Sequence, residues 1–180
     1  MRRSLLFIAL LLCISSIPEL QAQEVELQAQ EVAWMSWDEA VQKATKDTSP
    51  KKIFVDVYTD WCGWCKKMDK DTFQDPEVAA YMSENFYMVK LDAEQKDPIE
   101  FRGNSYTFVP SGRRGYHQLA AALLQGQMSY PTVVFLDEGL NMLSPVPGYQ
   151  KPDAFLKIAR YFGENIYKDT SWESYSSGSR

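Results

Sequence analysis

Two cysteines separated by two residues are the part of this sequence best suited to chemistry. Cys62 and Cys65 lie in the stretch DVYTDWCGWCKKMDKDTF, each directly after a tryptophan, where β-forming residues give way to helix-forming residues. A pair with this spacing can be a structural disulfide, half of a metal site or a redox catalyst. The surrounding sequence favours the third possibility.

A helix that begins at Cys62 would place both thiols on one face, a turn apart and within reach of a disulfide. The first thiol would lie beside unpaired backbone N–H groups at the positive end of the helix dipole. That position favours the thiolate, which is the form that attacks a disulfide. Cys62 is therefore expected to be the nucleophile, and the less exposed Cys65 is expected to resolve the mixed disulfide.

The other two explanations fit less well. A two-residue spacer closes too small a loop to restrict the unfolded chain much, so the pair makes a poor staple. A closed zinc site needs four ligands. His117 is the only histidine, and Cys62 and Cys65 are the only cysteines after the first 22 residues. We expect His117 to be a solvated residue at a helix start, and we expect no metal or other cofactor, because the cysteines themselves hold the electrons.

Residues 1–22 are typical of a secretory signal. Two arginines precede an apolar run from Leu5 to Ile14, and the polar residues that follow end near Ala22. A run of this length is about half of the ~20 residues needed to span a bilayer. The sequence thus predicts cleavage near Ala22, export to the periplasm, where disulfides persist, and a mature chain without a membrane span.

The composition and the positions of turn-forming and helix-capping residues predict one globular domain over residues 36–167. The chain has 180 residues, 45% of them hydrophobic and 13% aromatic, which is enough for one core. A flexible lead-in is expected at 23–35 and a disordered, serine-rich tail at 168–180. The formal net charge of −5 argues against nucleic acid as a partner. We expect a monomer.

The order of elements predicts an α/β fold in which helices cover both faces of a mixed sheet. Ser36 and Glu39 form a capping box that opens the first helix, and Asp75-Pro76 opens a later one. Residues 95–116 lack periodicity and predict an irregular insertion. The expected order is a helix from 36, a strand at 53–58, a helix from 62, a helix from 75, a strand at 86–94, the insertion, a helix at 117–125, a β-hairpin turning at 137–139, and a helix from 151.

FVDVYTDWCGWCKK resembles the active-site strand and helix of the thioredoxin superfamily, and SYPT resembles the segment that carries its cis-proline. The resemblance extends from Ser36 to Phe162 with matching element order. WCGWCKKMDKDTFQDPEVAAYM is most similar to exported bacterial thioredoxin-like proteins and to the periplasmic C-terminal domain of the transmembrane disulfide interchange reductase. The resemblance implies a thioredoxin fold and a thiol:disulfide oxidoreductase that acts on protein dithiols or disulfides together with a separate redox partner. Reduction or interchange is favoured over oxidation.

The resemblance also implies roles for four residues around the pair. Asp56, six positions before Cys62, matches a buried acid that assists proton transfer at the resolving thiol, and Lys90 matches its lysine partner. A carboxylate in an apolar strand has its pKa raised by desolvation, which suits a proton carrier near neutral pH. A structural ion pair is the alternative. Pro131 would be cis, and the Tyr130 backbone would offer hydrogen bonds to an extended substrate.

Trp61, Gly63 and Trp64 complete the predicted substrate-binding residues. Trp64 is expected to form an apolar rim, whereas Trp61 is expected to pack against the sheet. Thioredoxin has Gly-Pro between its cysteines, so Gly63-Trp64 leaves the direction of electron transfer open. Two other functions also stay open: a polypeptide-binding or chaperone-like module that uses the insertion at 95–116 as a wall, and a redox-sensing subunit of an envelope complex.

Overall fold

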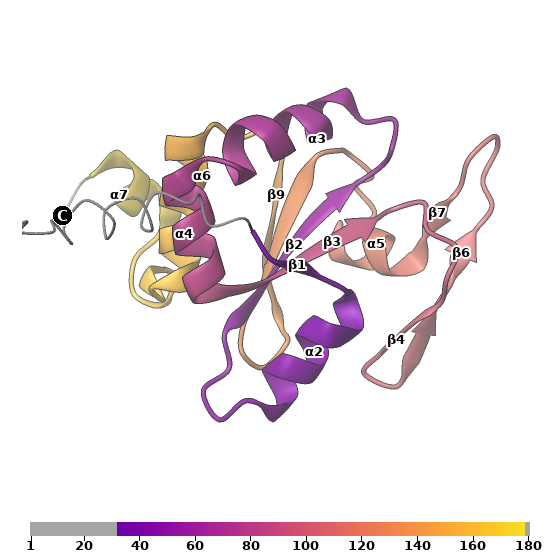
Figure 1. Cartoon of the computed structure of the whole chain (residues 1–180), viewed down its shortest axis with the longest axis horizontal. Coiled ribbons are helices and arrows are strands. Elements are labelled where there is room, and N and C mark those ends of the chain that lie inside the picture. Colours follow the sequence, from indigo (N-terminus) through magenta and orange to yellow (C-terminus); the bar gives the residue numbers. More distant parts are fainter. Residues whose placement is uncertain (1–31, 179–180) are drawn as a thin grey trace, which may run out of the picture.

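A five-stranded mixed sheet forms the centre of the protein (Figure 1). The computed structural model describes residues 32–178, so the predicted signal and most of the lead-in lie outside the described residues. The strand order is β1-β3-β2-β8-β9, with β3 parallel to β1 and β2, and β8 antiparallel to β2 and β9. The strands are β1 (Trp34–Met35), β2 (Lys52–Tyr58), β3 (Phe86–Asp92), β8 (Thr132–Leu136) and β9 (Met142–Pro147).

The central strand β2 is buried on both faces, as its apolar sequence predicts. Successive side chains point to opposite faces of a strand. Phe54 accordingly packs in one hydrophobic cluster, where its ring contacts Phe73, Phe135 and Phe155, while Val55 packs in the other. The lone carboxylate of this strand, Asp56, therefore lies inside the molecule.

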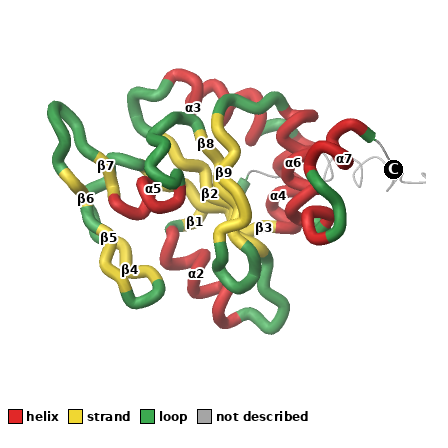
Figure 2. The backbone as a smooth tube through the Cα atoms, turned by 180° about the vertical axis from the view of Figure 1, so that it is seen from behind, coloured by secondary structure: helices red, strands yellow, loops and turns green. Residues whose placement is uncertain are grey.

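Helices cover both faces of the sheet, which confirms the predicted α/β architecture (Figures 1 and 2). The predicted capping box is present: Ser36 Oγ accepts from Glu39 N, and the Glu39 carboxylate accepts from Ser36 N. α2 (Trp37–Lys46) and α5 (Gln118–Leu123) pack in the cluster of Val55. The cluster of Phe54 is covered by α3 (Gly63–Met68), the π-helix η1 (Asp69–Phe73), α4 (Pro76–Asn85) and α6 (Pro152–Gly163).

Residues 95–116, expected to be irregular, contribute to two short hairpins at one end of the molecule (Figure 1). The second hairpin is attached to the domain because His117 N donates to Ala93 O at 2.6 Å. His117 was expected to be solvated, but it is fully buried. Its Nδ1 accepts from Leu119 N at the start of α5. The hairpins pair β4 (Ile99–Phe101) with β5 (Asn104–Tyr106), and β6 (Phe108–Val109) with β7 (Tyr116–His117).

Both ends of the described chain are more ordered than the sequence suggested. Trp34, in the expected lead-in, pairs in β1, and its ring packs on Phe54 and Phe73. The chain after α6 forms the 3-10 helix η2 (Ile166–Lys168), and the expected tail forms α7 (Trp172–Ser177), at the opposite end from the hairpins (Figure 2). The rings of Trp172 and Tyr175 pack on Tyr161, which explains why a serine-rich segment is held in place. The expectation of a disordered tail is corrected accordingly for residues up to 178.

Candidate active site

Cys62 and Cys65 form a disulfide at the start of α3, with their Cα atoms 5.3 Å apart. The chain turns after β2 through a hydrogen bond from Cys62 N to Thr59 O at 3.0 Å. Cys62 is the N-cap of α3, and its Sγ accepts from Cys65 N at 3.0 Å. The first sulfur thus has the backbone donor that was expected at the N-terminus of a helix.

Both cysteines are buried in this oxidised state. Cys62 is 5% exposed and Cys65 is 2% exposed, so the first cysteine is the more accessible by a small margin only. Approach to Cys62 therefore depends on the side chains that surround it, among them the two exposed tryptophans.

Asp56 and Lys90 lie opposite each other on the parallel strands β2 and β3. Asp56 is 1% exposed, and its Oδ2 accepts from Lys90 Nζ at 3.2 Å. Its Oδ1 has no hydrogen-bond partner among the described residues. Burial raises the pKa of Asp56 to about 6, with Lys90 opposing the rise and Asp69 adding to it. The site therefore contains a buried carboxyl group that changes its charge near neutral pH.

Lys90 contacts two carboxylates and two aromatic rings. Besides Asp56, its Nζ forms an ion pair with Asp69, the first residue of the π-helix η1, and lies 4.9 Å from the ring centroids of Trp34 and Tyr58. Burial alone would lower the pKa of Lys90, but the two carboxylates outweigh it and the pKa is raised. Sequence reasoning missed Asp69, although its position four residues after Cys65 would have placed both on one helix face.

Trp61 is half exposed and does not pack against the sheet as expected. Its ring meets Tyr130 edge to face at 5.9 Å, and its Nε1 donates to Glu94 Oε1 at 3.1 Å. The guanidinium carbon of Arg114 lies 4.2 Å from the centroid of the indole. Sequence reasoning missed Glu94 and Arg114, because only the fold brings them to Trp61.

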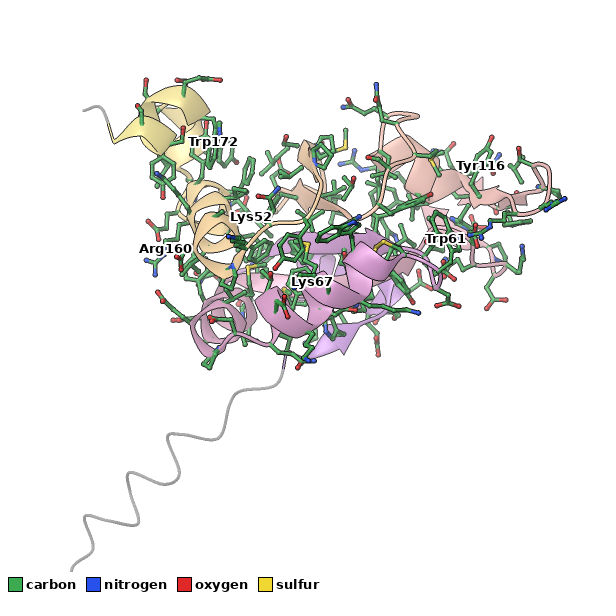
Figure 3. All side chains as sticks on the ribbon, turned by 90° about the horizontal axis from the view of Figure 1, so that it is seen from above. Lys52, Trp61, Lys67, Tyr116, Arg160 and Trp172 are labelled. Atoms are coloured by element: carbon green, nitrogen blue, oxygen red, sulfur yellow. A yellow bond between two sulfur atoms is a disulfide. The ribbon has the colours of Figure 1, made fainter. Side chains whose placement is uncertain are left out.

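Trp64 is the second large exposed apolar side chain of the described residues. Its ring lies 5.5 Å from that of Tyr149, over which Lys67 Nζ lies at 5.6 Å. Trp61 lies toward the insertion that carries Tyr116, whereas Lys67 lies farther along α3 (Figure 3). The two tryptophans thus contact different aromatic rings, with a cation over Trp61 and another over Tyr149, the ring partner of Trp64.

The remaining predicted residues are Gly63, between the two cysteines, and Tyr130 and Pro131, before β8. Gly63 is the first residue of α3, and a Cβ there would meet nothing within 4 Å. The peptide bond between Tyr130 and Pro131 is cis and directly precedes β8. Burial, together with Glu94 and Asp92, raises the pKa of Tyr130 to about 12, so its phenol is neutral at physiological pH.

The described part of the chain, residues 32–178, contains no group of three or more His, Cys, Asp or Glu side chains that could hold a metal ion. Within the same residues, no helix is long and apolar enough to cross a membrane.

A disulfide that caps the helix after a central buried strand, in a mixed sheet covered on both faces, defines a thioredoxin-like protein. The chain belongs to the family described as Thioredox_DsbH, protein of unknown function, DUF255, whose model matches residues 21–144. A solved structure titled DsbH Oxidoreductase has a TM-score of 0.53 at 20% identity, covering 87% of this chain and 95% of that one. At this identity the likeness shows the fold alone.

Curated relatives share part of the sequence. The chain is 39% identical over 120 residues to the thiol:disulfide interchange protein DsbD of Vibrio vulnificus, which covers 64% of this chain and 17% of that protein. It is 32% identical over 69 residues to the disulfide bond reductase DsbH of Chlamydia pneumoniae, covering 38% and 41% respectively. The chain spans only 9% of the length of another relative, human spermatogenesis-associated protein 20.

Proposed function

We propose that this protein is an exported thiol:disulfide oxidoreductase that exchanges disulfides with protein substrates through Cys62-Gly63-Trp64-Cys65, and that it acts as a reductase or interchange protein. The observation that carries the proposal is the disulfide at the N-terminus of α3, in a domain that also buries the Asp56–Lys90 pair. The names of its relatives, a disulfide bond reductase and a thiol:disulfide interchange protein, support the same activity.

The reaction needs no cofactor. In the reduced protein, the Cys62 thiolate attacks one sulfur of a substrate disulfide, and the other substrate sulfur leaves as a thiolate that takes up a proton. Cys65 then gives up its proton and attacks Cys62 Sγ, which breaks the mixed disulfide and releases the second substrate thiolate. The protein pair loses two electrons and the substrate gains two. A redox partner returns the pair to the dithiol by the reverse sequence.

Asp56 is proposed to accept the proton of Cys65 during resolution. A pKa of about 6 keeps the carboxyl group ionised at neutral pH yet able to bind a proton. Its Oδ1 lacks a hydrogen-bond partner among the described residues, so a proton bound there displaces no existing contact. Lys90 and Asp69 set the charge around this carboxylate, and they act on the reaction through Asp56.

Export is proposed from residues 1–22, with the periplasm as the compartment and a monomer as the working form. The arginines, apolar run and small residue of that segment support cleavage near Ala22. Expression with the leader intact, followed by N-terminal sequencing of the periplasmic protein, tests this. A new N-terminus near residue 23 is expected, and an uncleaved protein retained in the cytoplasm would contradict export.

Insulin reduction separates this activity from a polypeptide-binding role. With dithiothreitol as electron donor, wild type should accelerate insulin precipitation, whereas Cys62→Ser should fall to the rate of dithiothreitol alone. Cys65→Ser should accumulate mixed disulfides on Cys62 that reducing gels resolve. Equal activity of wild type and Cys62→Ser, or no activity in either, would instead support a binding module.

A further inference from the structure

The hairpin β6–β7 holds Arg114 in a defined position on the ring of Trp61, the residue before Cys62. Gly115 has φ +125°, and a Cβ there would lie 2.3 Å from Phe108 Cζ, so the hairpin packs at this point without strain only when the residue is glycine. The hairpin is attached to the end of β3 by the hydrogen bond from His117 N to Ala93 O. A residue of the insertion is thus fixed next to the rim of the active site.

Arg114 lies on Trp61 but leaves most of its hydrogen-bonding groups unused. Its guanidinium carbon is 4.2 Å from the indole centroid, and its Nη1 is 4.0 Å from Glu94 Oε1. Its side chain is 52% exposed and makes no hydrogen bond to another described residue. A guanidinium stacked on an aromatic face still presents its N–H groups at the edge of its plane, in the geometry that binds a carboxylate.

The charges around Trp61 other than Arg114 are mainly negative. Glu94 accepts from the indole N–H, and Asp60 is exposed directly before Trp61. Burial raises the pKa of Asp92, and the carboxylates of Asp60 and Glu94 raise it further, while the backbone N–H of Glu94 and the charge of Lys96 oppose the rise. Asp60 and Glu94 therefore both lie within electrostatic reach of Asp92. Arg114 is the cation that contacts the Trp61 ring itself, whereas Lys96 lies over the ring of Phe108. Arg114 is therefore the positive charge placed to offset these carboxylates at Trp61.

We propose that Arg114 is a specificity-determining residue that selects protein substrates with an acidic side chain close to the reacting cysteine. This inference rests on the proposed oxidoreductase function and names the class of substrate. The substrate carboxylate binds the unused edge of the guanidinium, while the exposed face of Trp61 packs against neighbouring apolar atoms of the substrate. When Arg114 is absent, the carboxylates of Asp60, Asp92 and Glu94 remain, and they favour a basic side chain at the same place.

Matched peptide disulfides test the selection. Each peptide carries one cysteine, with Glu, Gln or Lys either two residues before it or two residues after it, and is used as the symmetric disulfide. Each peptide reacts with the dithiol form of the protein, prepared with dithiothreitol and desalted, and chromatography measures the rate at which peptide thiol appears. Reaction of each peptide with glutathione corrects for its intrinsic reactivity. The variants are Arg114→Ala, Arg114→Lys and, as a control of equal charge in the same turn, Arg113→Ala.

At low salt, wild type should reduce the Glu peptide about three- to fivefold faster than the Lys peptide at one of the two positions, the size expected of one exposed ion pair. Salt at 0.5 M should remove most of this ratio. Arg114→Ala should bring the ratio to one or below, whereas Arg114→Lys and Arg113→Ala should keep it above one.

Equal rates for the Glu and Lys peptides in wild type, or an unchanged ratio in Arg114→Ala, would overturn the inference and leave the proposed function intact. No peptide thiol from any peptide, together with inactivity on insulin, would overturn the proposed function itself.

Discussion

The inner side of the disulfide has a buried carboxylate paired with a lysine, whereas its outer side has exposed aromatic residues. On the inner side, Asp56 is almost fully buried and its charge is balanced by Lys90, whose other partner is Asp69. On the outer side, Trp61 and Trp64 are more than half exposed. Burial makes electrostatic effects large, because a charged group in the low dielectric of the interior has its pKa shifted more than the same group in water.

The difference fits the roles proposed for the two sides, proton transfer inside and substrate recognition outside. A proton carrier needs a shifted pKa and therefore a buried position, at a cost to stability. A surface that receives different polypeptides needs exposed apolar area and weak contacts that many sequences can make. Substitutions inside should therefore have large effects on rate and stability, and substitutions outside should have small effects on stability and selective effects on substrate binding.

Asp56→Asn should produce the largest effect, on the resolving step. Loss of a positioned general base lowers a rate by about 10²-fold or more, so release of the second substrate thiol should slow to that extent at pH 7. In wild type, the rate of this step should rise with pH through about 6, as the carboxylate becomes ionised, and the variant should lose that rise. Stopped-flow tryptophan fluorescence of the dithiol form with excess peptide disulfide measures the step.

Asp153→Asn is the matched control, because Asp153 is an exposed carboxylate in the first turn of α6. It should leave both the rate and its pH profile unchanged. A wild-type profile without a rise near pH 6, or an Asp56→Asn variant that resolves at the wild-type rate, would reduce the Asp56–Lys90 pair to a structural ion pair.

The same substitution should stabilise the oxidised protein. The folded pKa of Asp56 is about 6 against an ordinary value of 3.8, so between these values the folded state binds more protons than the unfolded state, and stability falls as pH rises. Two pKa units correspond to about 3 kcal/mol. Asparagine also buries an amide, so we expect a net gain of about 2 kcal/mol at pH 7 and almost none at pH 4.

Urea unfolding of wild type and Asp56→Asn at the two pH values measures this gain. Lys90 keeps its contact with Asp69 in the variant, so its charge retains a carboxylate partner. Equal stability of the two proteins at pH 7 would mean that Asp56 carries no burial penalty, and the contrast between the two sides of the disulfide would lose its basis.

The fold could be predicted where local and long-range preferences agree. The capping box of Ser36 and Glu39 and the Asp75-Pro76 N-cap both open helices where expected, and the apolar strand around Asp56 is central. Elements that depend on tertiary contacts could not be predicted. β1 has two residues, and its Trp34 is held between Phe54 and Phe73. The tail helix α7 likewise depends on a contact with another element, because Trp172 packs on Tyr161 of α6.

The candidate site divides in the same way. Cys62 and Cys65 follow from their spacing, and Asp56 and Lys90 from a resemblance that the strand register supports. The contacts of Glu94 and Arg114 with Trp61 could not be inferred, because they join the end of β3 and a hairpin turn to the loop before α3. Pattern reasoning finds groups that share an element and misses those that meet only in the folded chain.

Gly115→Ala should loosen the hairpin that carries Arg114 without removing any charge. A Cβ would collide with Phe108 at a positive φ, which we expect to cost about 1 to 2 kcal/mol. The penalty should be local, so the amide of His117 should lose hydrogen-exchange protection by about one order of magnitude, with little change in the global urea midpoint. Gly112→Ala, at φ +58° with nothing within 4 Å, should have a smaller effect. Equal protection in both variants would mean that the hairpin does not depend on close packing at Gly115.

Trp64→Ala should give the smallest change in stability, below about 0.5 kcal/mol, because the side chain is already 59% exposed. Its effect should appear as a rise in KM for insulin of about threefold with kcat nearly unchanged, since a docking surface contributes equally to ground-state and transition-state binding. Trp172→Ala is the matched control: that ring packs on Tyr161 in the tail, so its loss should lower stability and leave KM unchanged. If Trp64→Ala lowered kcat and left KM unchanged, Trp64 would belong with the inner group that controls the chemistry, and exposure alone would not separate recognition from reaction in this protein.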